Sequence, residues 1–301
     1  MRIPTMICFI LLLVLFNSAN YSCKQSDDVM SRQTPFDSTL INLLIRCDDI
    51  GMCHSVNEAM MQLIASKIPF SASVLFPCPA FQEAIDILKQ HPEVSVGVHL
   101  TLNAEWKNYR WGPVAGAANV PSLVDSDGFF FPSSAAFYNH QPKISEIETE
   151  LRAQIERALN SGLAIDHIDT HMGTISSNYQ VYQLAEHLAA EYKLPISGEC
   201  GEQYVSPGIY SVPLAYKTDS LVSSIKNLRP GSVYLIVSHI GLETPEMNAL
   251  VDFNPGGLTE IGKNRHAELL ALTSSDFLQA LSVYKVKLLT YRQYLSTIQN
   301  H

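Results

Sequence analysis

Short apolar runs of strand length alternate with segments of helical period along most of this 301-residue chain. The apolar runs predict strands at 41–47, 70–76, 94–100, 164–169, 194–197, 232–238 and 286–289. Segments with one apolar side predict a helix that opens at Ser55 and helices over 79–91, 144–161, 178–192, 218–228, 266–281 and 291–298. Within 266–281, Ser274-Ser275-Asp276 is a candidate interruption of the helix. Such an alternation is typical of an α/β fold with a parallel sheet.

Two long segments, 103–142 and 240–265, interrupt this alternation. The first contains Trp106, Tyr109, Trp111 and the run Phe129-Phe130-Phe131. A loop of this length in a compact domain is usually functional or an insertion. Its aromatic side chains therefore either stack on a ligand or pack the loop itself.

Polar residues suited to metal binding follow several of the expected strands. Asp48 and Asp49 follow the first, His99 lies near the end of the third, and the fourth runs on into His171. The carboxyl ends of parallel strands meet at one face when the sheet curls into a barrel. We therefore predict one distorted (β/α) barrel of about seven parallel strands, with these side chains gathered at one site.

The adjacent carboxylates of Asp48 and Asp49 resist joint ionisation, which a metal ion or a shared proton relieves. Neighbours on an extended strand point to opposite faces, so one carboxylate is free to bind a metal and the other to act as a general base. The alternative is that one of them only caps the following helix.

His99 and His171 add two imidazoles to the carboxylates, which gives the ligand set of an open catalytic metal site. Asp169 lies two residues before His171 and is placed to orient an imidazole. His239 follows the strand at 232–238 and is a candidate general acid. Arg265 is a candidate to hold the base carboxylate or to reach the substrate. For His99 and His239 the alternative is a packed or capping histidine.

Composition narrows the classes of function. The net charge of −9 makes nucleic acid an unexpected partner. Gly-x-Ser-x-Gly, Walker and Gly-x-Gly-x-x-Gly motifs are absent from the sequence. Whether the chain forms a homodimer is left open.

The first residues are typical of an export signal. Arg2 precedes an apolar run over 6–16 that is too short to span a bilayer, and Cys23 lies where a bacterial lipoprotein is lipidated. We predict a signal peptide at 1–23, a flexible polar tether at 24–40 and the barrel at 41–301. The protein is then exported to the cell envelope, in the periplasm or on the cell surface, and meets the membrane only through its lipid anchor. A plain secreted protein is the alternative.

Four motifs resemble the YdjC-like carbohydrate deacetylases, which include the chitin-disaccharide deacetylases and are distant relatives of the NodB-type polysaccharide deacetylases. They are Asp48-Asp49-Ile50-Gly51 with Asn57, Gly97-Val98-His99-Leu100-Thr101-Leu102, His167-Ile168-Asp169-Thr170-His171, and His239 after its strand. The motifs lie within residues 43–281, which is most of the chain after the signal.

This resemblance implies a distorted (β/α) barrel and a hydrolase that uses one divalent metal ion, Mg²⁺ or Zn²⁺, to remove acetyl groups from N-acetylated oligosaccharides. In that family pattern Asp49, His99 and His171 are the metal ligands. Asp48 is the base, and His239 is the general acid. Trp106 is then a candidate to stack on the sugar.

The sequence departs from the family pattern after His171. Family members usually continue with further histidines, whereas Met172-Gly173-Thr174 stand here. Two other functions therefore remain open. One is a phosphoesterase or glycosidase that uses the paired carboxylates as acid and base without a metal. The other is a surface lipoprotein that binds glycans and is catalytically inactive.

Overall fold

The computed structural model describes residues 36–299. The predicted signal peptide, Cys23 and most of the predicted tether lie outside these residues. Among the helices within 36–299, none is long and apolar enough to cross a membrane.

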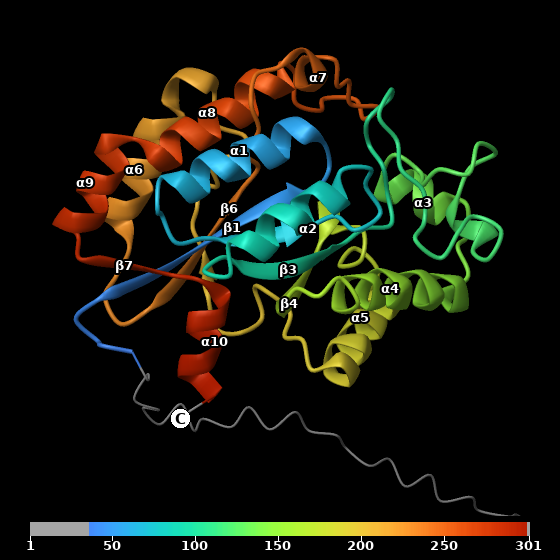
Figure 1. Cartoon of the computed structure of the whole chain (residues 1–301), viewed down its shortest axis with the longest axis horizontal. Coiled ribbons are helices and arrows are strands. Elements are labelled where there is room, and N and C mark those ends of the chain that lie inside the picture. Colours follow the sequence, from blue (N-terminus) through green and yellow to red (C-terminus); the bar gives the residue numbers. More distant parts are fainter. Residues whose placement is uncertain (1–35, 300–301) are drawn as a thin grey trace, which may run out of the picture. The chain divides into compact units, whose positions relative to one another are not determined.

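A curled sheet of parallel strands forms the centre of the described chain (Figure 1). Its strands are β1 (Ile41–Ile50), β2 (Ser71–Val74), β3 (Ser95–Leu100), β4 (Ile165–Thr170), β5 (Gln203–Tyr204), β6 (Val233–Ser238) and β7 (Val286–Leu289). They follow the order β4-β3-β2-β1-β6-β5, and β7 pairs with β1. The predicted α/β fold, a distorted (β/α) barrel of about seven parallel strands, is confirmed.

The distortion of the barrel originates at β1, whose ten residues are all buried. One edge of β1 pairs with β6 along 42–47. The other edge pairs first with β7 along 41–44 and then with β2 from Arg46 onward. Because β2 and β7 share one edge of the same strand, the sheet cannot close as a regular barrel.

Helices pack around this sheet, and two of them have six residues or fewer. They are α1 (His54–Ala65), α2 (Phe81–Gln90), α3 (Ser134–Asn139), α4 (Ile144–Leu159), α5 (Tyr179–Tyr192), α6 (Lys217–Asn227), α7 (Pro245–Asn248), α8 (Ile261–Thr273), α9 (Ser275–Val283) and α10 (Tyr291–Gln299). Figure 1 shows α1, α6, α8 and α9 grouped beside β6 and β7, and α4 and α5 grouped near β4.

Two predicted elements differ from the structure. The strand expected at 194–197 is only an isolated pairing of Ile196 with Ile168, because Pro195 has no N–H to donate and the chain turns at Gly198 with φ +96°. The edge strand is instead β5. The helix expected at 266–281 is two helices, α8 and α9, which meet at Ser274, and α8 begins already at Ile261.

His167 is a packed residue inside the barrel. Its ring stacks on Tyr291 with a centroid distance of 4.3 Å and is fully buried. Gly97 on β3 makes room for it, since a Cβ at Gly97 would lie 2.2 Å from the Nε2 atom of His167. The closely packed ring of His167 therefore fills part of the barrel interior below the strand ends.

Candidate metal and catalytic site

The end of β1 carries a β-bulge at the two adjacent aspartates. The register with β2 shifts between Cys47 and Ile50, and Asp49 has a left-handed backbone with φ +63°. A bulge redirects side chains from the strict alternation of a strand. Asp48 and Asp49 consequently line the same cavity, instead of facing opposite sides. Neither caps α1, whose N-cap is Cys53 without a side-chain hydrogen bond.

Three donor atoms converge at the strand ends. The Oδ1 atom of Asp49 lies 3.3 Å from Nε2 of His99 and 3.2 Å from Nδ1 of His171, and those two nitrogens are 3.2 Å apart. All three residues are buried. Asp49 Oδ1 has no hydrogen-bond partner among the described residues. An unpaired buried carboxylate oxygen facing two imidazole nitrogens is the arrangement expected of a metal-binding triad.

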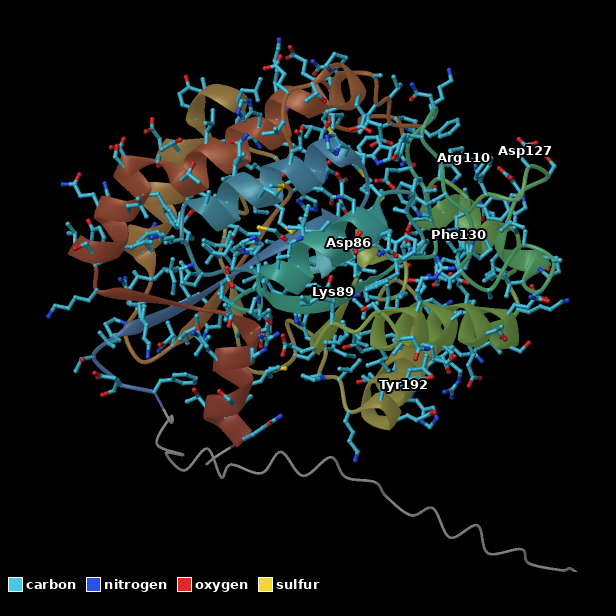
Figure 2. The ribbon with its side chains drawn as sticks, viewed as in Figure 1. Asp86, Lys89, Arg110, Asp127, Phe130 and Tyr192 are labelled. Carbon is cyan, nitrogen blue, oxygen red and sulfur yellow. The ribbon has the colours of Figure 1, made fainter. Side chains whose placement is uncertain are left out.

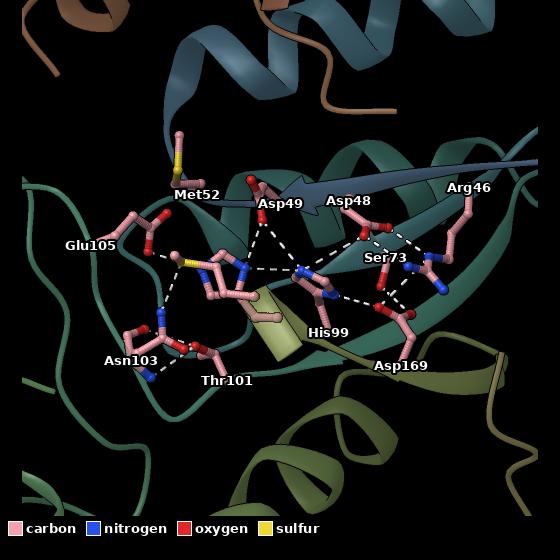
Figure 3. A network of polar contacts seen from close by, with 12 residues as sticks. Arg46, Asp48, Asp49, Met52, Ser73, His99, Thr101, Asn103, Glu105 and Asp169 are labelled. Atoms are coloured by element: carbon pink, nitrogen blue, oxygen red, sulfur yellow. Dashed lines mark hydrogen bonds and ion pairs between the residues drawn. The ribbon is translucent and has the colours of Figure 1, made fainter. Parts of the chain in front are cut away.

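Each imidazole is oriented by a carboxylate on its far side. His99 Nδ1 makes a short hydrogen bond to Asp169, whose Oδ2 accepts a hydrogen bond from Ser73 Oγ at 2.5 Å. His171 Nε2 bonds to Glu105 Oε2 at 2.9 Å. Figure 3 shows Asp49 and His99 facing each other, with Asp169 beyond the ring. Such carboxylate partners fix the tautomer of a metal-binding histidine.

The sequence indicated Asp169 as a partner of an imidazole but not Glu105. Glu105 lies in the irregular segment 103–142 rather than at the end of a strand, so no periodicity points to it. Its backbone is positioned by a hydrogen bond from Phe253 N–H to its carbonyl oxygen at 2.8 Å. That contact joins two segments nearly 150 residues apart, which sequence patterns do not reveal.

The carboxylates create a negative potential at this cluster. Burial alone lowers the pKa of His99, but Asp48 and Asp169 raise that pKa to about 10. Burial also lowers the pKa of His171, but Glu105 and Asp49 outweigh this effect and raise that pKa to about 9. Positive charge is therefore stabilised at this place, and a metal ion would compete with protons for the same nitrogens.

Different arginines hold the two aspartates. Arg46 contacts Asp48 through both carboxylate oxygens, with Nε–Oδ1 at 2.7 Å and Nη2–Oδ2 at 2.9 Å. Arg265 Nη2 lies 2.6 Å from Asp49 Oδ2. Burial disfavours the charge on Asp49, yet Arg265 and His171 hold the pKa of Asp49 well below its usual range. Arg265 thus contacts Asp49 and not Asp48, the expected base. Asp48 is held instead by Arg46, which lies two residues earlier on the same side of β1.

His239 follows β6 and presents its ring to the same cavity. Its backbone N–H donates to Glu268 Oε2 at 2.8 Å, and Ser238 Oγ donates to the same oxygen. The ring of Tyr210 lies 4.8 Å away, centroid to centroid. Within residues 36–299, Nδ1 of His239 has no hydrogen-bond partner. Burial lowers the pKa of His239, so its imidazolium form gives up a proton readily.

These groups surround one cavity of about 260 Å³. Its lining residues come from strand ends, from loops and, for Arg265, from helix α8: Asp48, Asp49, His99, Glu105, Trp106, His171, Met172, Tyr210, His239, Asp252 and Arg265. A concave site with a few convergent polar groups is the usual form of a small-molecule site. All the expected ligand and acid–base residues therefore meet in one place.

The aromatic residues of segment 103–142 divide into two groups. Trp106 is 2% exposed and lines the cavity. Trp111 is buried with its ring against that of His171, at a centroid distance of 6.0 Å, whereas Phe130 and Phe131 are buried in the packing of the segment itself. Figure 2 shows Arg110 and Phe130 on this segment beside α3. For these other aromatic residues the loop-packing alternative describes the structure.

The chain is thus an α/β protein, a distorted (β/α) barrel with an Asp, His, His cluster at its strand ends that could hold a metal ion. The chain belongs to the YdjC-like protein family, whose model matches residues 42–283. The resemblance inferred from the motifs is thereby confirmed.

Individual relatives agree with this family. A carbohydrate deacetylase of Geobacillus stearothermophilus is 27% identical over 259 residues, covering 83% of this chain and 97% of that protein. A carbohydrate deacetylase of Brevibacillus brevis is 31% identical over 156 residues, which cover 52% of this chain and 58% of that protein. An Enterococcus faecalis V583 protein named for cellobiose-phosphate cleavage has the same fold, with a TM-score of 0.70 at 22% identity over 85% of this chain and 99% of its own.

Proposed function

We propose that this protein is a metal-dependent hydrolase that removes acetyl groups from N-acetylated sugars or oligosaccharides. The observation that carries the proposal is the convergence of Asp49, His99 and His171 in a cavity that also contains Asp48 and His239. The relatives named carbohydrate deacetylase support the choice of substrate class. Release of acetate from N-acetylglucosamine oligosaccharides by the purified protein is the test.

The donor set fits a zinc-like ion. Asp49, His99 and His171 would hold the ion through one carboxylate oxygen and two imidazole nitrogens, which lie 3.2–3.3 Å from one another. Two imidazoles with one carboxylate also suit zinc chemically.

In the proposed hydrolysis a water oxygen bonds to the acetyl carbon, the C–N bond breaks, and acetate and a sugar amine result. A metal ion held by Asp49, His99 and His171 would supply Lewis acidity toward the carbonyl and the water. Asp48, held in place by Arg46 and with Oδ2 4.0 Å from His99 Nε2, accepts the proton of the attacking water. His239 protonates the leaving nitrogen. Arg265 Nη1, buried and unpaired within the described residues, is available to the acetyl oxygen.

The carboxylates behind the imidazoles are expected to tune metal affinity. Asp169→Asn and Glu105→Gln keep the shape of each side chain but weaken its bond to His99 or His171. We expect each to lower zinc affinity by about 10- to 100-fold, measured by competition with a chromophoric chelator. Asp86→Asn, an exposed position on α2, is the control and is expected to bind zinc as the wild type does. Wild-type affinity in both site variants would contradict the assigned ligands.

We also propose that the enzyme acts outside the cytoplasm, anchored through a lipid on Cys23. The support is the apolar run over 6–16 followed by a cysteine, with a polar segment after it. Incorporation of an alkyne-labelled fatty acid in a bacterial host is expected for the wild type and absent for Cys23→Ser. Labelling of both proteins, or of neither, would contradict the anchor.

A further inference from the structure

One wall of the cavity is a short antiparallel ribbon that joins the two long irregular segments. Lys107 N–H donates to Val251 O at 2.7 Å, and Phe253 N–H donates to Glu105 O at 2.8 Å. Between these bonds Trp106 pairs with Asp252. The ribbon brings the carboxylates of Glu105 and Asp252 to the cavity. Asp252 lies outside the metal-capable cluster and has no role in the proposed hydrolysis.

The cavity lining carries more negative than positive charge. Four carboxylates line it, those of Asp48, Asp49, Glu105 and Asp252, and Arg265 is the one lysine or arginine in the lining. Arg265, Arg46 behind Asp48 and a divalent cation at the three-donor cluster would together balance these four carboxylates. Asp48 and Asp49 face arginines, and Glu105 faces His171. Asp252 is the lining carboxylate that has no cationic partner within residues 36–299.

The carboxylate of Asp252 is held in place with one oxygen left over. Its Oδ1 accepts hydrogen bonds from the backbone N–H of Asn254 at 2.7 Å and from Asn254 Nδ2 at 2.9 Å. Its Oδ2 accepts none from the described residues. Gly257 lies against this oxygen, since a Cβ there would be 2.3 Å from Oδ2. A fixed acceptor with a free lone pair is suited to a hydroxyl or ammonium donor and repels an anion.

We propose that Asp252 determines which sugars enter this cavity: it favours uncharged or amine-bearing rings and rejects rings that carry a phosphate or a carboxylate. This inference rests on the proposed function, because it concerns the sugar unit next to the reacting acetamido group. Arg265 Nη1 is buried and has no hydrogen-bond partner within residues 36–299, so it offers a neutral carbonyl oxygen a donor in the same cavity. The free oxygen of Asp252 accepts a hydrogen bond from the remainder of the ring, or repels an anionic group there.

The test compares two probes that differ in one anionic group, N,N′-diacetylchitobiose and its 6-phosphate. Their binding to zinc-loaded protein is measured by calorimetry, and acetate release is measured separately. We expect the wild type to bind the uncharged disaccharide about 10- to 100-fold more tightly than the phosphate. Asp252→Asn is expected to reduce that preference about tenfold, while Asp252→Glu retains most of it. Asp127→Asn, an exposed position of the same charge change on segment 103–142 (Figure 2), is the control and is expected to keep the wild-type preference.

Each result decides for or against the inference. Equal or tighter binding of the phosphate by the wild type would overturn it, and so would failure of the wild type to bind either sugar. A wild-type preference that persists in Asp252→Asn would overturn the role of Asp252. Selective binding that depends on Asp252 without acetate release from either probe would support this inference and contradict the proposed deacetylation.

Discussion

Replacing His171 with glutamine is expected to abolish metal binding and to reduce acetate release by about 10³-fold or more. His171 Nδ1 is one of three donor atoms within 3.3 Å of each other, and glutamine offers no nitrogen lone pair in its place. Lewis-acid assistance contributes several kcal/mol to such a reaction, and about 4 kcal/mol corresponds to roughly 10³ in rate. The substitution leaves the ion pair of Asp49 with Arg265 in place, so the fold is expected to survive.

Metal binding can be followed without any substrate. At a free zinc concentration of about 100 Kd the wild type should gain about 2.7 kcal/mol in its free energy of unfolding, measured in urea. His171→Gln should show no such gain. His187→Gln makes the same change at an exposed histidine of α5 and should behave as the wild type. Equal stabilisation of the wild type and His171→Gln by zinc would show that His171 is not a ligand.

Replacing His239 with glutamine is expected to lower kcat by about 10²- to 10⁴-fold while zinc affinity stays unchanged. His239 lines the cavity but is not one of the three converging donors. Its ring packs beside Tyr210 and its Nδ1 has no partner in the described part of the chain, whereas its backbone N–H donates the hydrogen bond to Glu268. Removing the ring therefore removes a proton donor without removing the contact that positions the chain.

The leaving group provides the control for this role. An amine must be protonated as the C–N bond breaks, whereas 4-nitrophenolate leaves without a proton. His239→Gln should therefore hydrolyse 4-nitrophenyl acetate at close to the wild-type rate, although its kcat on N-acetylated sugars is strongly reduced. A loss of similar size on both substrates would mean that His239 acts on binding or on structure, and not as the general acid.

The strand ends and their side chains could be predicted because both follow from local patterns. Apolar runs of strand length marked β1, β3, β4 and β6, and chemically distinctive residues lie at the ends of these strands or directly after them. Parallel strands bring these ends to one face, so the meeting of Asp49, His99 and His171 follows from topology alone. The prediction of a strand at 194–197 was wrong. This segment has the apolar composition of a strand, but Pro195 lacks the backbone N–H that strand pairing requires.

Other features of the site depend on long-range contacts that no local pattern encodes. Glu105 and Asp252 reach the cavity only because two irregular segments pair as a ribbon. Arg46 looked like an ordinary strand residue, although its guanidinium holds Asp48. The shared orientation of Asp48 and Asp49 required a bulge and a left-handed residue, which override the alternation of side chains in a strand.

The most direct measurement is acetate release from N-acetylglucosamine oligosaccharides by protein lacking residues 1–23, assayed as purified, after chelation, and with Zn²⁺ or Mg²⁺ restored. We predict release that is lost on chelation, is restored by Zn²⁺ better than by Mg²⁺, and is absent in His171→Gln under every condition. Full activity after thorough chelation would contradict the metal-dependent mechanism and favour a metal-free hydrolase that uses the paired carboxylates. Sugar binding with no acetate release under any metal would contradict deacetylation and favour a glycan-binding protein.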